Sequence, residues 1–404
     1  MRLHTAEPAG TADAEPVPYP FNEADGISLA DAYEEAREQP GLLRVRMAYG
    51  EPAWLATRYA DARLVLGDRR FSRAEGARHD EPRQSEGRRD SGILSMDPPD
   101  HTRLRTLVAK AFTMHQVEKL RPAVRELADE LIDKMVATGA PVDLVEEFAL
   151  PVPVGVICQL LGVPVEDRPR FRAWSDAALS TSSLTAEEFD ANQEELRAYM
   201  RGLIEDHRAR PREDLITGLI EARDRDDRLT EQELVDLCVG ILVAGHETTA
   251  TQIPNFVVTL LDRPEQWNRL REDPELVPTA VEELMRFVPL GSGASFPRYA
   301  TEDVEVGGTL VRAGEPVLVA VGAANRDPAR FDAPQELDLA REGNQHLGFG
   351  HGVHHCLGAP LARLELQEAL GALLRRLPGL RIAGDIEWKT QMLVRGPRTL
   401  PVGW

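Results

Sequence analysis

Cys356 is the residue of this chain whose type and setting most directly predict chemistry. It lies in a glycine-rich turn, residues 349–358, and apolar residues at a helical period follow it from Leu361 to Leu377. Glycines lack a Cβ, so the turn can bend sharply and let a large flat group come close. Free N–H groups and the helix dipole at a helix N-terminus both favour a thiolate over a thiol. We therefore expect Cys356 to be a thiolate ligand.

The turn has three interpretations. Cys356 could be a buried structural cysteine, or a zinc ligand together with His351, His354 and His355. Zinc needs four converging ligands, and adjacent side chains such as His355 and Cys356 rarely converge on one tetrahedral ion. A thiolate in a turn lined by glycines and an aromatic residue is instead typical of a ligand to haem iron, and this third interpretation is favoured.

A second chemical signal lies inside a long predicted helix, Leu229–Leu261. Thr230 and Glu233 are spaced as a capping box, which marks the start of the helix. About 32 residues at ~1.5 Å each give a rod of ~48 Å, long enough to cross a whole domain. The segment Cys238–Gly245 is apolar all round, so we expect it to be buried on every side.

Glu247 and Thr248 follow directly in this apolar helix. Charged and hydroxyl groups are costly in a protein core unless they are paired or have a function. One interpretation is structural: Thr248 donates to the carbonyl of residue 244, and Glu247 forms a salt bridge. The other is that the pair faces a reaction site and handles protons there. The residues alone leave both open.

Two further pairs have helical spacing. Glu283 and Arg286 are three residues apart, close enough for a bidentate ion pair, although most such pairs are surface contacts that stabilise little. His101 and Arg105 are four residues apart and share one helix face. That face could be an exposed basic surface or an anion site.

The run Phe349-Gly350-x-Gly-x-His354-x-Cys356-x-Gly358 resembles the haem-binding signature of the cytochrome P450 family. The stretch Ala244–Thr249 is similar to the oxygen-activation motif of that family, and the Glu283–Arg286 pair precedes the cysteine as it does there. This resemblance implies a mainly α fold with a minor β region, in which haem b lies between the long helix and the Cys356 loop. We expect a flexible arm at residues 1–26 and one domain at residues 27–404.

The resemblance also implies roles for individual residues. Cys356 would bind the iron, with Phe349, Gly350 and Gly358 around the haem. Gly245 would leave room for dioxygen, Thr248 would hydrogen-bond the oxygen at the iron, and Glu247 would pass protons inward. The expected ligands of the haem propionates are His101, Arg105, Arg298 and His354. The expected substrate pocket consists of Val243, Ala244, Ala294, Met392 and Leu393.

Glu283 and Arg286 would form a structural pair that steadies the cysteine loop. In the family an arginine of a later element often completes this network, but Glu336 stands at the corresponding position here. Arg330 and Arg341 are the candidates to replace it.

Composition limits the possible partners and compartment. The chain has 404 residues, with 67 acidic and 47 basic side chains and a net charge of −20, which argues against nucleic acid as a general partner. Its three cysteines imply no disulfide framework. No apolar run is long enough to span a bilayer, and the N-terminal segment has no apolar signal region. We expect a cytoplasmic protein that does not contact a membrane.

Electrons must come from separate proteins, because no dinucleotide-binding or Walker-type glycine loop is present. We expect a ferredoxin and a ferredoxin reductase fed by NAD(P)H. A basic patch near Cys356 could steer the ferredoxin; the candidates are Arg103, Lys110, Lys119 and Arg363.

The expected activity is monooxygenation, in which one atom of O2 enters the substrate by hydroxylation or epoxidation. A bulky apolar molecule of secondary metabolism is the expected substrate. The alternatives are a peroxygenase or a haem-dependent isomerase, which would not need the Glu247–Thr248 pair. A non-enzymatic haem sensor is a further alternative, but such proteins usually carry an output domain, and the sequence shows none.

Overall fold

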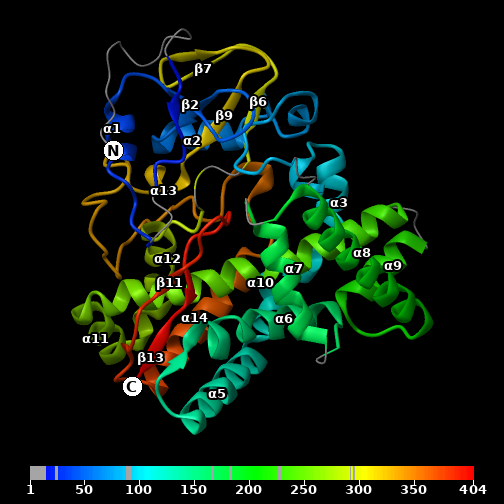
Figure 1. The fold of residues 1–404 in the computed structure, drawn as a ribbon, viewed down its shortest axis with the longest axis vertical. Coiled ribbons are helices and arrows are strands. Elements are labelled where there is room, and N and C mark those ends of the chain that lie inside the picture. Colours follow the sequence, from blue (N-terminus) through cyan, green and yellow to red (C-terminus); the bar gives the residue numbers. More distant parts are fainter. Residues whose placement is uncertain are drawn as a thin grey trace.

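The structure is a computed structural model that describes residues 15–22, 26–87, 92–164, 167–181, 184–224, 229–291, 293 and 296–404. It has a large helical part and a smaller β-rich part, which lies at the top of Figure 1. The mainly α fold with a minor β region is confirmed. None of the helices in the described residues is long and apolar enough to cross a membrane.

The helices reproduce most of the periodic segments of the sequence. The α-helices are α1 (Ala32–Glu38), α2 (Tyr59–Gly67), α3 (Asp100–Ala109), α4 (Met114–Glu118), α5 (Arg121–Thr138), α6 (Pro151–Leu161), α7 (Arg168–Leu179), α8 (Ala186–Ala209), α9 (Leu215–Asp224), α10 (Glu231–Leu261), α11 (Pro264–Glu272), α12 (Val277–Phe287), α13 (Val321–Ala324) and α14 (Ala359–Arg376). Short 3-10 or π turns are η1 (Ala74–Arg78), η2 (Gly92–Ser95), η3 (Lys110–Phe112), η4 (Val145–Ala149), η6 (Pro274–Leu276) and η7 (Gly352–His354).

The strands are short and come from distant parts of the chain. They are β1 (Val17–Pro18), β2 (Leu43–Arg46), β3 (Ala53–Ala56), β4 (Phe71–Ser72), β5 (Val142–Asp143), β6 (Arg298–Ala300), β7 (Val304–Val306), β8 (Thr309–Val311), β9 (Pro316–Val319), β10 (Arg381–Ile382), β11 (Glu387–Trp388), β12 (Pro397–Thr399) and β13 (Pro401–Gly403). The single-domain expectation for residues 27–404 stays a prediction.

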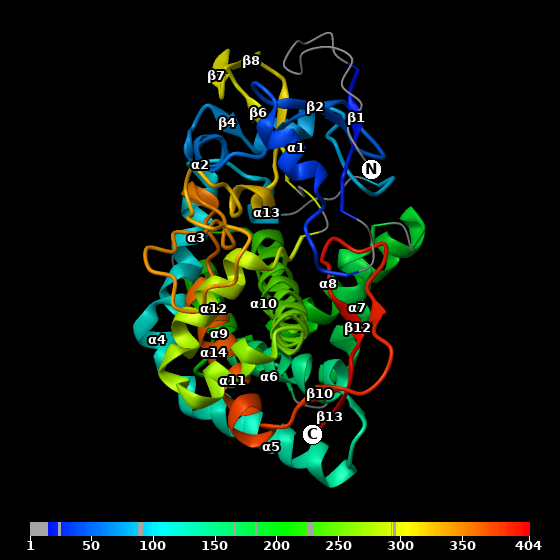
Figure 2. The same ribbon diagram turned by 90° about the vertical axis from the view of Figure 1, so that its left-hand side faces the viewer.

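The helix α10 crosses the helical part of the molecule, and Figure 2 shows it nearly end-on among other helices. The capping box is confirmed: Thr230 accepts from the N–H of Glu233, and the Glu233 side chain accepts from the N–H of Thr230. The expectation of burial on every side is wrong at Gly240 and Ala244, which are exposed. One side of α10 therefore faces away from the core close to the acid–threonine stretch.

The main sheet has six strands in the order β1-β2-β3-β9-β6-β4. Its residues alternate between two apolar clusters, as the two-residue period of a strand requires. Trp54 and Ala56 join the cluster under α2, whereas Ala53 and Leu55 join the cluster that contains Tyr33 of α1. Both faces of the sheet are therefore covered, and β6, which carries Arg298, is paired on both sides, with β9 and with β4.

The expectation of a loose arm over residues 1–26 is wrong for the part that the structure describes. Val17 and Pro18 pair in parallel with Val45 and Arg46 of β2. Tyr19 is buried, and its ring contacts those of Phe21 and Tyr33 edge to face. Aromatic burial fixes this segment against the sheet.

The C-terminal hairpin formed by β11 and β12 links three regions of the molecule. Its two strands pair with a bulge. Beyond β11, Met392 forms an isolated antiparallel bridge with Ser180 after α7, and Val394 forms one with Gly291 after α12. These two bridges join the residues between β11 and β12 to the ends of α7 and α12.

Candidate active site

The loop around Cys356 is held by its own backbone. The N–H of Gly350 donates to the carbonyl of Leu347 at 2.8 Å, and the N–H of Cys356 donates to the carbonyl of Phe349 at 2.8 Å. Gly350 has a φ of +74°, a conformation that glycine adopts without strain. At Gly358 the φ is −82°, and among the described residues no atom outside the adjoining backbone and chain neighbours lies within 4 Å of where a Cβ would stand. The surrounding protein therefore leaves space at Gly358 for the approach of another group.

Cys356 lies two residues before the N-cap of α14, as the sequence predicted. The N–H groups at this position act in the expected direction and lower the pKa of Cys356, but they are not the largest influence on it. Desolvation raises the pKa of the Cys356 thiol, and it outweighs the N–H groups of Gly358 and Ala359 and the charges of Arg105 and Arg363. The side chain still has accessible surface, so a ligand can reach it. A metal ion would supply the missing charge, because a coordinating thiol is deprotonated.

His101 and His354 form a cluster of nitrogen atoms next to this loop. Their ring centroids are 4.3 Å apart. Nδ1 of His101 and both ring nitrogens of His354 are buried without a hydrogen-bond partner in the described part of the chain. Desolvation, helped by the charge of Arg298, lowers the pKa of His354 to about 3. Buried polar atoms are normally hydrogen-bonded, so this cluster suits a bound group that offers oxygen atoms.

Arg298 on β6 gives the cluster its charge. Its side chain is buried near Arg73, and desolvation together with that like charge lowers the pKa of Arg298 to about 9. Two buried guanidinium groups near each other favour a nearby anion. The structure thus brings together three of the four expected propionate ligands: His101, His354 and Arg298.

Arg105, the fourth expected propionate ligand, contacts the cysteine loop. One of its nitrogens donates to the carbonyl of His355 at 2.6 Å, directly before Cys356. This bond connects α3 to the cysteine loop. Arg105 therefore braces the loop in this structure, and its expected contact with a propionate stays a prediction.

On α10 the structure shows both contacts of the structural interpretation. The hydroxyl of Thr248 donates to the carbonyl of Ala244 at 3.0 Å. The carboxylate of Glu247, which is 3% exposed, accepts from Nζ of Lys389 at 2.5 Å. The α-helix runs without interruption from residue 231 to residue 261. The proton-handling role of the two side chains stays a prediction.

Gly245 lies where α10 packs closely against α6. A Cβ at this position would lie 2.6 Å from Cδ1 of Ile157 on α6. That distance is shorter than real Cβ contacts allow, so the glycine is required for close packing of α6 against α10. The expectation that the missing side chain also makes room for dioxygen stays a prediction.

The expected pocket residues lie on two segments. Val243 is half-buried and Ala244 is exposed on α10, whereas Met392 is buried and Leu393 half-buried beyond β11. Ala294 lies outside the described residues. The N–H of Leu393 donates to the carbonyl of Leu179, which joins this segment to the end of α7.

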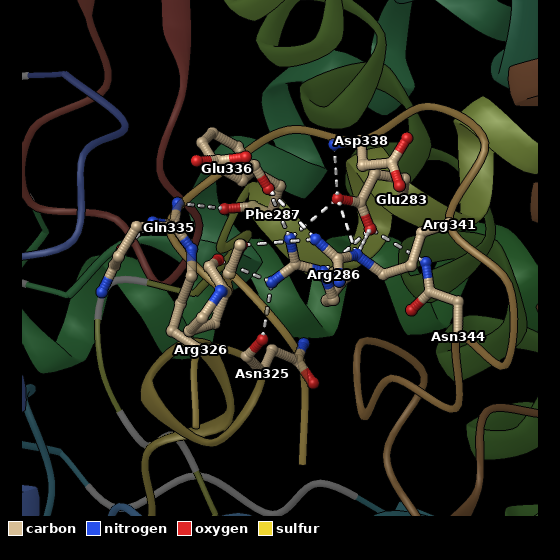
Figure 3. Close-up of polar contacts among 12 residues, drawn as sticks. Glu283, Arg286, Phe287, Asn325, Arg326, Gln335, Glu336, Asp338, Arg341 and Asn344 are labelled. Carbon is tan, nitrogen blue, oxygen red and sulfur yellow. Dashed lines mark hydrogen bonds and ion pairs between the residues drawn. The ribbon is translucent and has the colours of Figure 1, made fainter. Parts of the chain in front are cut away.

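The Glu283–Arg286 pair is buried and bidentate, with Nε and one terminal nitrogen of Arg286 each 2.8 Å from a carboxylate oxygen (Figure 3). Arg341 closes the network: its Nε lies 3.2 and 3.1 Å from the two oxygens of Glu283. Arg330 instead donates to the carbonyl of Gly343. The backbone carbonyl of Glu336 accepts from Arg286, so the missing arginine at that position is replaced by Arg341 from further along the chain.

Arg286 also reaches toward the cysteine loop. It donates to the carbonyl of Asn325, and the side chain of Asn325 accepts from the N–H of Leu347 at 2.7 Å. Leu347 in turn accepts from Gly350. A continuous chain of hydrogen bonds therefore connects α12 to the turn before Cys356.

Sequence reasoning missed Glu282, which makes a second connection to the loop. Its carboxylate accepts from His346 and from Arg363 of α14. Desolvation acts to raise the pKa of Glu282, but these two partners together outweigh it and hold the pKa at about 2. The guanidinium of Arg363 also stacks over the ring of Phe349, 4.4 Å from its centroid. The adjacent carboxylates of Glu282 and Glu283 were the available signal, but their partners are distant in sequence.

Glu365 on α14 and Lys389 after β11 were also missed. Glu365 is fully buried, and neither carboxyl oxygen has a hydrogen-bond partner of normal geometry among the described residues. Burial raises the pKa of Glu365 well above its usual value, and the nearby Thr249 hydroxyl offsets this only in part. Neither residue belongs to a recognisable motif.

Comparison with known proteins identifies the class to which this fold and site belong. The family model described as "Cytochrome P450" matches residues 171–378. The chain is 56% identical to the mycinamicin IV hydroxylase/epoxidase of Micromonospora griseorubida, over 97% of this chain and 99% of that protein. It is 52% identical to the nocardicin C N-oxygenase of Nocardia uniformis subsp. tsuyamanensis, over 96% of this chain and 98% of that protein.

Solved structures agree. A structure of HinD with NMFT and NO has a TM-score of 0.94 at 50% identity and covers 97% of this chain and 100% of that chain. A structure of the mixed-function P450 MycG has a TM-score of 0.90 at 56% identity, covering 96% and 100%. The chain therefore belongs to the cytochrome P450 family, and it is of the bacterial actinomycete type. It is a haem-thiolate monooxygenase that uses O2 and redox partners.

Proposed function

We propose that this enzyme inserts one oxygen atom into a bulky, mainly apolar small molecule, by hydroxylation or epoxidation, as a tailoring step of secondary metabolism. The observation that carries the proposal is the placement of Cys356 at the start of α14 beside the unpartnered nitrogens of His101 and His354. Relatives named as a hydroxylase/epoxidase and as an N-oxygenase support the same reaction class.

The cofactor we propose is haem b, with Cys356 as the ligand of its iron. Phe349, Gly350 and Gly358 would lie against the ring, and Gly358 leaves space for it. His101, His354 and Arg298 would donate to the two propionates, because they offer buried donors and positive charge. When bound, the haem supplies the activation of dioxygen, so that one oxygen atom enters the substrate and the other leaves as water.

The residues of α10 would manage protons and substrate position. Thr248 holds a proton on Oγ1 next to Ala244, and Glu247 lies one residue away as the acid that would replenish it. Val243, Ala244, Met392 and Leu393, with Ala294, would form the apolar wall that orients the substrate. Apolar walls with few polar groups are typical of small-molecule sites.

Electrons would come from a ferredoxin and its NAD(P)H-fed reductase, in the cytoplasm. The expected basic patch needs revision, because two of its four members are engaged in ion pairs. Arg103 lies 2.5 Å from Glu233, and Arg363 lies 2.7 Å from Glu282. Lys110 and Lys119 are exposed on α3–α5 surface turns and are the cations on which the proposed contact now depends.

The haem-thiolate assignment predicts a spectrum. The reduced protein with carbon monoxide should show the long-wavelength absorption of a sulfur-ligated haem, and Cys356→His should lose it while haem is retained. A wild-type spectrum like that of a histidine-ligated haem would exclude Cys356 as the ligand. Turnover driven by peroxide but not by ferredoxin and O2 would favour the alternative peroxygenase.

The role of Thr248 gives a second test of the same function. Thr248→Ala should keep the haem and the carbon monoxide spectrum but divert electrons to hydrogen peroxide. Product per electron should fall by about tenfold or more, since a positioned proton donor contributes about 10²–10⁴-fold. Thr259→Ala is the matched control. The hydroxyl of Thr259 likewise donates to the carbonyl four residues earlier, that of Asn255, at 2.7 Å, but Thr259 lies near the C-terminal end of α10. We call the yield of product per electron the coupling. If the coupling of Thr248→Ala equalled that of the wild type, Thr248 would have no part in the mechanism.

A further inference from the structure

Lys389 and Glu247 form a buried ion pair that joins the C-terminal hairpin to α10. Their side chains are 7% and 3% exposed, and Nζ of Lys389 lies 2.5 Å from Oε1 of Glu247. Nζ also donates to the hydroxyl of Thr251 at 2.8 Å, one turn along the helix. A buried ion pair with a third polar partner fixes the orientation of the carboxylate, because leaving this geometry would strand a charge in the core.

The base of the hairpin is fixed on α10 at the same place. The N–H of Lys389 donates to the carbonyl of Gly396 at 2.8 Å, and the side chain of Asn255 donates to the carbonyl of Arg395 at 2.8 Å. A Cβ at Gly396 would lie 2.7 Å from both Oδ1 of Asn255 and Cγ2 of Thr251. The position of Lys389 beside Glu247 is therefore fixed by backbone and packing contacts between the hairpin and α10.

The other end of the hairpin is bonded to the segment between α7 and α8. The N–H of Thr181 donates to the carbonyl of Gln391 at 2.7 Å, and the N–H of Leu393 donates to the carbonyl of Leu179 at 3.0 Å. On the opposite side, the N–H of Arg395 donates to the carbonyl of Leu290 at 2.8 Å. One short hairpin thus contacts the α7–α8 segment, the segment after α12 and the acid of α10.

We propose that Lys389 is a positioning residue for Glu247, and that the hairpin makes this positioning depend on contact with the α7–α8 segment. When residues 179–181 bond to the hairpin, Lys389 holds Glu247 in place for proton delivery. When those backbone bonds are broken, Lys389 loses its fixed position and Glu247 loses its orientation. The inference rests on the proposed proton role of Glu247.

Three variants test the positioning role. Lys389→Met removes the charge and keeps the length of the side chain, so product per electron should fall by about tenfold and the solvent isotope effect should increase. Lys389→Arg should retain most of the coupling. Glu247→Gln/Lys389→Met should be no less coupled than Glu247→Gln alone, since the lysine would act only through the glutamate.

Structural loss is separated from positioning by two further measurements. Arg121→Met breaks an ion pair to the buried Glu368 far from Glu247, so it should lower the melting temperature without changing coupling. A double-mutant cycle on thermal stability gives the second measurement. The stability losses caused by the Glu247 and Lys389 substitutions should be non-additive, because the two side chains form one ion pair. If Lys389→Met does not fold, Lys389→Gln takes its place, because it also removes the charge while its polar amide is tolerated beside Glu247 and Thr251; the same direction of change in product per electron is expected.

The dependence on the α7–α8 segment has its own test. Thr181→Pro removes the N–H that bonds to Gln391, so coupling should fall by several-fold, and the same change should have no further effect on coupling in a Lys389→Met background. If the losses of coupling caused by Thr181→Pro and Lys389→Met were additive, the link through the hairpin would be overturned.

A Lys389→Met enzyme with normal coupling and isotope effect would overturn the positioning role itself. If the wild type lacks the carbon monoxide spectrum of a sulfur-ligated haem, the proposed function fails instead. The two failures are therefore distinguishable.

Discussion

Glu365 and Glu368 lie one turn apart on α14, and their surroundings shift their pKa values in opposite directions. Glu368 accepts hydrogen bonds from Arg121 and Arg125. Desolvation acts to raise the pKa of Glu368, but these two partners outweigh it and the pKa is lowered. Glu365, one turn earlier, is fully buried, and burial raises its pKa well above the usual value. Burial thus favours the neutral form of Glu365, whereas the two arginines favour the charged form of Glu368.

This contrast predicts opposite effects on stability. Glu365 has a folded-state pKa above its unfolded-state pKa, so its contribution is complete below the unfolded value of about 4.3 and is lost as pH rises toward the folded value. Glu365→Gln removes this loss, so it should stabilise the protein at pH 8, with a smaller effect near pH 5. Melting curves across this range give the measurement.

Glu368→Gln is the matched control. Its folded-state pKa is lowered, so its stabilisation is present above the unfolded value and is lost as pH falls. This substitution should destabilise the protein at pH 8. A destabilised Glu365→Gln would show that Glu365 is charged and has a partner.

At the scale of elements, α10 is positioned by the helices that pack on it. Its start is set by local chemistry, the capping box of Thr230 and Glu233. Its closest approach to α6 is set by Gly245, where a Cβ would meet Ile157. Because Glu247 and Thr248 follow within one turn, the α6–α10 contact also sets where these two side chains lie.

Gly245→Ala should therefore be destabilising despite the better helix propensity of alanine. Overpacking of a core contact costs about 1–3 kcal/mol, which exceeds the ~1 kcal/mol that alanine gains over glycine in a helix. Ile157→Val should relieve part of the cost in the double variant, which denaturant unfolding can measure. If Gly245→Ala weakened carbon monoxide binding but left stability unchanged, space for a gaseous ligand would be the better explanation.

At the scale of the whole molecule, the excess of acidic groups must be reconciled with an acidic redox partner. A net charge of −20 repels such a partner at long range. Two arginines of the expected basic patch, Arg103 and Arg363, are neutralised by ion pairs. Attraction must come from the remaining exposed cations, Lys110 and Lys119.

We predict that reduction by a ferredoxin slows as ionic strength rises, because salt screens attraction between exposed charges. Lys110→Glu/Lys119→Glu should lower the second-order rate by about tenfold at low salt and much less at high salt. Arg103→Gln should have a smaller effect. Rates that are independent of salt in the wild type would contradict an electrostatic contact.

The amino-acid sequence by itself determined the features that depend on local spacing. The glycine turn before Cys356, the capped helix with Glu247 and Thr248, and the i, i+3 pair of Glu283 and Arg286 all follow from residues close in the chain. Helical period, capping and the lack of a Cβ act over a few residues, so they can be deduced without the fold.

Only the tertiary structure decided the features that join distant segments. Lys389 reaches Glu247 across 142 residues, and Arg341, not Arg330, closes the network of Glu283. The pKa of the Cys356 thiol is likewise raised because the surrounding protein desolvates it more than the helix start stabilises its charge. Burial and long-range pairing arise from packing, which is why local patterns placed these residues on their elements but did not identify their partners.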